Sequence, residues 1–107
     1  MQLRLSKPWL RFDPETVAKV PGQLGVFQLA DDSGAVLYIG YAGGRALFGL
    51  RSELQQHLGQ SATQFRYEVN MQYLTRYKEL LMLHKADNGS IPPGNQSEAP
   101  IRLGRIG

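Results

Sequence analysis

A turn-forming run between two stretches rich in β-branched and aromatic residues is the strongest constraint on the fold of this chain. Residues 25–30 and 35–40 are separated by Asp31-Asp32-Ser33-Gly34, which favours a tight chain reversal. The pattern predicts an antiparallel hairpin. If the loop consists of those four residues, Phe27 lies directly opposite Tyr38, and their side chains share one face.

The remaining pattern predicts one more strand and three helices. Asp13 before Pro14 is typical of a helix start, and this first short helix should end near Pro21. Residues 65–69 alternate as a half-buried strand does, and residues 72–86 carry the longest helical pattern. A further helix carries four leucines that should face the core: Leu47, Leu50, Leu54 and Leu58. The predicted class is α+β, with a small three-stranded antiparallel sheet flanked by helices.

Length and composition fit one domain. The chain has 107 residues, is 42% hydrophobic and contains no cysteine, so packing rather than disulfides or a zinc knuckle must hold it together. We expect an entry segment at 1–22, the main domain at 23–95 and a polar tail at 96–107 with an extended piece at 101–103. No stretch is long and apolar enough to span a membrane, and residues 1–12 do not resemble a secretion signal, so a cytoplasmic location is predicted.

Two strings in the hairpin, Gly25-Val26-Phe27 and Tyr38-Ile39-Gly40, together with Arg51 and Glu79 on predicted helices, resemble the GIY-YIG nuclease family over roughly residues 20–95. The resemblance implies an endonuclease that uses Mg²⁺ or Mn²⁺ to hydrolyse phosphodiester bonds in nucleic acid, with DNA as the expected substrate. Phe27 stands where the family carries its first tyrosine. One of the two hydroxyls of the family site is therefore missing.

The resemblance also implies a role for each site residue. Tyr38 would accept a proton from the attacking water, Arg51 would hold a phosphate oxygen, and Glu79 would bind the metal. His57 resembles the family residue at the end of the arginine-bearing helix. This hydrolytic interpretation requires the phenol, the guanidinium and the carboxylate to meet around one pocket.

Alternatives to these roles follow from the residues themselves. Glu79 follows Arg76 by three positions on a helix, a spacing that favours a simple ion pair. Tyr38 could pack against Phe27 as an ordinary aromatic pair. Measured back from His57, the family arginine falls at Glu53 as readily as at Arg51, which would reverse the charge.

Four further residues are candidates for nucleic-acid contact. Tyr41 and Arg45 lie in a glycine-containing connection that allows close approach of a ligand, and Lys85 lies late in the last long helix. Asn95 belongs to Pro93-Gly94-Asn95, which resembles a Pro-x-Asn element of the family. The net charge of +3 has the sign that phosphate binding needs.

Three functions remain open at this level. The first is the metal-dependent endonuclease. The second, motivated by Phe27 and Glu53, is a nucleic-acid-binding module that keeps the fold and cuts weakly or not at all. The third is a structural or protein-interaction domain, since a fold does not dictate a function. In so short a chain, specificity would come from a protein partner or from the shape of the substrate.

Overall fold

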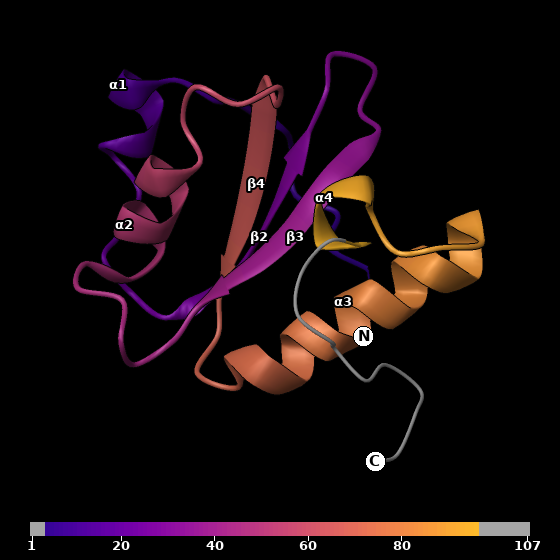
Figure 1. Ribbon diagram of the computed structural model, residues 1–107. Helices are drawn as coiled ribbons and strands as arrows, with labels where there is room; N and C mark the ends of the chain where they lie inside the picture. The colour runs from indigo at the N-terminus through magenta and orange to yellow at the C-terminus, as the bar shows by residue number, and fades with distance from the viewer. Residues whose placement is uncertain (1–3, 97–107) are drawn as a thin grey trace.

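The predicted hairpin forms the edge and centre of a sheet in the computed structural model, which describes residues 4–96 (Figure 1). Strands β2 (Gly25–Ala30) and β3 (Val36–Ala42) pair antiparallel, and β4 (Gln64–Val69) pairs with the other side of β2. A short strand β1 (Leu10–Arg11) completes the order β1-β4-β2-β3. The α+β class is confirmed, and the sheet has four strands rather than three.

The predicted register of the hairpin is wrong, and the first cause is its loop. The backbone N–H of Asp31 donates to the carbonyl of Ala35 (3.1 Å), so the loop consists of residues 32–34. The Asp31 carboxylate fixes this turn because it accepts hydrogen bonds from the backbone N–H groups of Ser33 and Ala35, each at 3.0 Å. The Ser33 hydroxyl, which donates to the same carboxylate at 2.6 Å, and these backbone bonds hold the pKa of Asp31 below its usual range.

A β-bulge is the second cause. Ala30 pairs with Val36, but Leu29 pairs with Tyr38, so Leu37 is an extra residue on β3. The shorter loop and the bulge each shift β3 by one residue relative to β2, so Phe27 pairs with Gly40 instead of Tyr38. A total shift of two residues leaves each side chain on the face that was predicted for it. The predicted face of Tyr38 is therefore right although its predicted partner is not.

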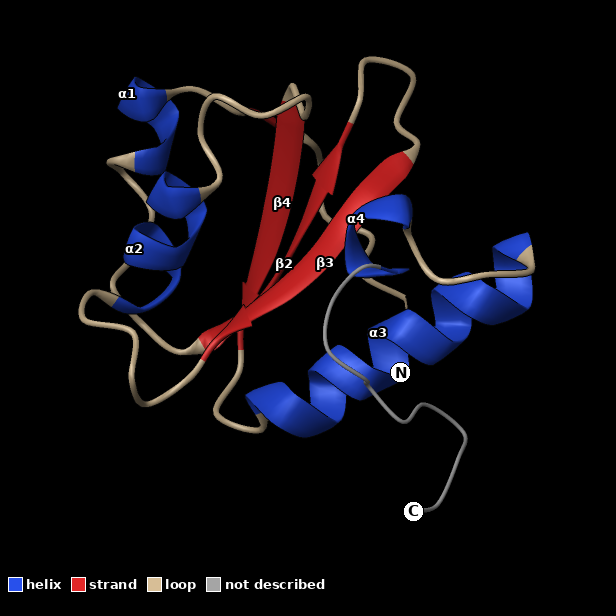
Figure 2. Ribbon diagram, viewed as in Figure 1, coloured by secondary structure: helices blue, strands red, loops and turns tan. Residues whose placement is uncertain are grey.

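Helices cover both faces of the sheet (Figure 2). On one face lie α1 (Pro14–Val17) and α2 (Gly49–Gln56), and on the other lies α3 (Tyr73–Asn88). The core under α1 and α2 includes Val17, Val20, Phe27, Leu29, Leu50, Leu54 and Phe65. The core under α3 includes Leu5, Val26, Ile39, Tyr77, Leu80 and Leu81.

Local signals explain most of the helix positions. Asp13 is the N-cap of α1 as predicted, and its carboxylate accepts the Thr16 N–H at 2.8 Å. Leu47 was expected in the core but is 82% exposed, because α2 begins only at Gly49 and Leu47 lies in the preceding turn. A helix was not expected near the C-terminus, yet α4 (Pro93–Gln96) packs against β3.

The predicted tail lies almost entirely outside the described residues. This includes the extended piece expected at 101–103. Among residues 4–96, no helix is long and apolar enough to cross a membrane.

A tyrosine-lined cleft as the candidate functional site

An open cleft of about 780 Å³ lies at the outer edge of β3. Four tyrosines line it: Tyr38 and Tyr41 from β3, and Tyr73 and Tyr77 from α3. Because side chains alternate along a strand, Tyr38 and Tyr41 point to opposite faces, and the cleft wraps around the strand edge between them. Arg45 and Glu53 line the same cleft from the loop after β3 and from α2.

The tyrosines of β3 and α3 form a compact aromatic group. The Tyr41 ring is nearly parallel to that of Tyr73, with centroids 5.7 Å apart, and is tilted against that of Tyr77 at 4.8 Å. Gly43 makes this possible, because a Cβ atom there would lie 2.9 Å from the Tyr73 ring. Tyr77 is buried, whereas Tyr41 remains 38% exposed and presents aromatic surface to the cleft.

The two charged residues of the cleft are available to a ligand. Arg45 is exposed and Glu53 is half-buried. Neither forms a hydrogen bond or ion pair with another residue in the described part of the chain. A bound molecule can therefore use both groups without first breaking an internal contact.

The rings of Tyr38 and His57 lie against each other. Their ring centroids are 4.7 Å apart, and the Phe27 ring lies 6.0 Å from Tyr38 and 5.7 Å from His57. Gly40 lies opposite Phe27, and a Cβ atom at this position would come within 2.4 Å of the Phe27 ring. The glycine of Tyr38-Ile39-Gly40 thus leaves the space in which Phe27 packs. His57 lines a smaller neighbouring pocket rather than the main cleft.

Arg51 does not reach the cleft. Its Nε donates to the backbone carbonyl of Val20 at 2.9 Å, which ties α2 to the segment after α1. Glu53 is the charged residue of α2 that lines the cleft with Tyr38. Of the two sequence positions considered for a phosphate-binding arginine, the one beside Tyr38 therefore carries a carboxylate.

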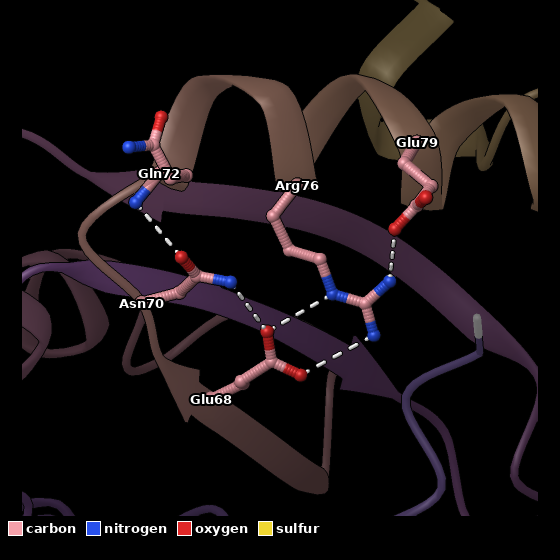
Figure 3. Close-up of polar contacts among 5 residues, drawn as sticks. All are labelled: Glu68, Asn70, Gln72, Arg76 and Glu79. Carbon is pink, nitrogen blue, oxygen red and sulfur yellow. Dashed lines mark hydrogen bonds and ion pairs between the residues drawn. The ribbon is translucent and has the colours of Figure 1, made fainter. Parts of the chain in front are cut away.

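Glu79 also lies away from Tyr38. It pairs with Arg76, as the alternative interpretation predicted, and Arg76 pairs with Glu68 of β4 at 3.0 Å (Figure 3). Glu68 is on the α3 face of the sheet because its neighbour Tyr67 packs with the core under α1 and α2. Tyr38 packs with that other core. The predicted meeting of Tyr38, Arg51 and Glu79 in one pocket is wrong.

Arg76 occupies the space between two carboxylates, and its side chain is only 9% exposed. Burial alone would lower its pKa, but hydrogen bonds from its guanidinium to Glu68 and Glu79 raise it above the usual value. Burial likewise would raise the pKa of Glu68, but hydrogen bonds donated by Arg76 and Asn70 bring it below its usual range. This network joins α3 to β4.

Glu79, the predicted metal ligand, is already engaged by an arginine. The guanidinium of Arg76 already pairs with the carboxylates of Glu79 and Glu68, which are oxygen donors of the kind that Mg²⁺ uses. Residues 4–96 contain no cluster of three or more histidine, aspartate or glutamate side chains suited to a metal ion. Binding of Mg²⁺ or Mn²⁺ at Glu79 would have to compete with this ion pair and stays a prediction.

Of the four residues predicted to contact nucleic acid, two line the cleft and two do not. Tyr41 and Arg45 line the cleft, as described above. Asn95 is 2% exposed, and its amide binds the backbone of β3: it accepts the Ile39 N–H at 2.9 Å and donates to the Ile39 carbonyl at 2.8 Å. These bonds give Asn95 a structural role at β3, and its predicted contact with nucleic acid stays a prediction. Lys85 is exposed on α3 and does not line the cleft.

Sequence reasoning missed part of the cleft. Tyr73 and Tyr77 lie in the helix predicted at residues 72–86 and were not predicted as site residues, although their spacing of one helical turn places them side by side. Their proximity to Tyr41 depends on how α3 crosses the sheet, which no local pattern reveals.

This α+β domain, with its sheet between two helical layers and its edge cleft, belongs to a family described as a domain of unknown function (DUF7508), whose model matches residues 1–87. No curated protein matches the chain. The family description assigns no activity, and the resemblance to GIY-YIG nucleases stays a prediction.

Proposed function

We propose that this protein is a nucleic-acid-binding domain that uses the tyrosine-lined cleft as its binding surface. The main support is the combination of exposed aromatic surface at Tyr41 with an arginine, Arg45, that has no internal partner among the described residues. Aromatic faces stack on bases, and a nearby guanidinium binds phosphate. The net charge of +3 favours such binding.

Hydrolysis of the bound nucleic acid is less well supported than binding. Tyr38 and Arg45 share the cleft, which is consistent with a reactive site, but Glu79 is held by Arg76 on the other face of the sheet. We therefore favour the binding module over the endonuclease that the GIY-YIG resemblance implies. The preference for DNA, a specificity-giving protein partner and a cytoplasmic location also stay predictions.

Fluorescence anisotropy with labelled DNA and RNA tests the proposal. Binding should weaken as salt rises from about 50 to about 200 mM, because phosphate contacts release counterions. Tyr41→Leu should weaken binding about tenfold through lost stacking. Tyr67→Leu is the matched control, since Tyr67 lies on β4 and does not line the cleft.

The same oligonucleotides incubated with Mg²⁺ or Mn²⁺ separate binding from hydrolysis. We expect no metal-dependent product. Products that form with the wild type and disappear in Glu79→Ala would favour the endonuclease instead. If no DNA or RNA binds at low salt, or if Tyr41→Leu and Tyr67→Leu bind equally well, the proposed function is wrong.

A further inference from the structure

The geometry points to a specific ligand for the tyrosine-lined cleft: an unpaired base that carries an exocyclic amine, held with its phosphates outside the cleft. This inference rests on the proposed nucleic-acid-binding function and narrows it to single-stranded segments. Three features carry it, namely the aromatic lining, the position of Glu53 and the position of two lysines on α3.

The aromatic lining favours an unpaired base. The cleft, of about 780 Å³, has room for a base beside the exposed ring of Tyr41. A base inside a duplex is stacked on both sides by its neighbours, so its face cannot reach a protein ring unless it leaves the helix. An unpaired base has free faces and can stack directly.

Glu53 makes the inside of the cleft unsuitable for a phosphate and suitable for a base edge. Glu53 is half-buried, and its carboxylate has no internal partner among residues 4–96. A carboxylate only accepts hydrogen bonds and repels a phosphate, but it pairs well with the amino group of cytosine or adenine. Thymine and uracil have no exocyclic amine, so they should bind less well.

Two lysines that would hold phosphates lie outside the cleft. Leu74 lines the cleft, and Lys78 and Lys85 follow it by four and eleven residues, which places all three on one stripe of α3. Both lysines are exposed and lie about 10 Å apart along the helix axis. A single nucleic-acid strand that leaves the cleft along this stripe would place its phosphates near Lys78 and Lys85. Arg45 would bind a phosphate at the cleft itself.

Anisotropy measurements with single-stranded oligo-dC and oligo-dT of about twelve nucleotides and a matched hairpin duplex test this inference. We expect oligo-dC to bind about tenfold more tightly than oligo-dT, and the duplex to bind more weakly than oligo-dC. Glu53→Gln should reduce the ratio of oligo-dC to oligo-dT affinity, because a neutral amide is a weaker acceptor.

The ratio distinguishes hydrogen bonding from bulk charge. If Glu53 acts only through repulsion, Glu53→Gln will strengthen binding of both oligonucleotides equally and leave the ratio unchanged. Glu15→Gln, an exposed carboxylate on α1, is the matched control and should not alter the ratio. Lys78→Ala should lower the affinity for both oligonucleotides by the same factor. Lys19→Ala, which lies beyond α1, should change neither affinity.

The outcomes also separate this inference from the proposed function. If nucleic acid binds but the duplex binds as tightly as oligo-dC, or if Glu53→Gln leaves the ratio unchanged, the base-binding inference is wrong and the proposed function survives. If no oligonucleotide binds at low salt, both are wrong.

Discussion

Two regions of this molecule place arginine beside glutamate, and they differ in whether those charges are engaged. Between α3 and β4, Arg76 is almost buried and hydrogen-bonded to Glu68 and Glu79. In the cleft at the edge of β3, Arg45 and Glu53 make no polar contact with the described residues. The first set stabilises the fold, and the second is available to a partner. Residue type alone does not distinguish them.

The largest expected effect comes from breaking the engaged set. Arg76→Met removes the cation and leaves Glu68 partly buried without its partner, so the free energy of unfolding should fall by about 3 kcal/mol. Urea denaturation followed by circular dichroism measures this loss. Arg45→Met is the matched control and should change stability by less than about 0.5 kcal/mol. Equal losses in the two variants would contradict the comparison.

A neutral contact on the cleft side should have the next largest effect. Asn95→Ala removes both hydrogen bonds to the Ile39 backbone and leaves the buried N–H and C=O of Ile39 without these partners. We expect a loss of about 2 kcal/mol in unfolding free energy. Thermal denaturation measures it, with Gln96→Ala on the same helix as the control. An unchanged melting temperature would show that Asn95 does not hold the edge.

The pH dependence of stability sharpens the comparison further. The folded-state pKa of Glu68 is lowered, so its ionised form stabilises the protein above the unfolded-state pKa, and that stabilisation is lost as pH falls through the folded-state pKa. Glu68→Gln should therefore cost about 1.5 kcal/mol near neutral pH and progressively less in acid. Urea midpoints of the variant and the wild type should converge as the pH is lowered. A constant difference would contradict this account.

The smallest effect on stability is expected in the cleft. Glu53→Gln should change the free energy of unfolding by less than about 0.5 kcal/mol, because no internal contact depends on its charge. Its consequence should appear only in ligand binding. A large loss of stability, measured by the same urea titration, would show that Glu53 has a structural role after all.

The hairpin and the helices could be predicted because their signals are local. Asp13, the turn at residues 31–34 and the spacing of Leu50 and Leu54 act over a few positions, and each produced the expected element. The register could not be predicted, because the loop is one residue shorter than the turn-forming run and the bulge at Leu37 has no turn signal in the sequence. The fourth strand, β1, was not predicted because it is only two residues long and is defined by its pairing with β4.

The candidate site was predictable only in part, for a physical reason. Tyr38, Tyr41 and Arg45 lie within eight positions, so one strand and its following loop place them together. Glu79 is separated from Tyr38 because the sheet lies between them, and a strand pattern does not state which face a later helix covers. The ion pair of Glu79 with Arg76 could be predicted from the sequence, since it depends only on helical spacing.

The amide of Asn95 offers Ile39 one donor and one acceptor, which is what a residue of a neighbouring strand would offer. It thereby caps the middle of an outermost strand whose open backbone groups could otherwise recruit the same strand of another molecule. Asn95 lies beyond residue 87, where the family match ends. A protein shortened to that boundary would lose this cap, and we expect it to self-associate through β3 even if its core remained folded.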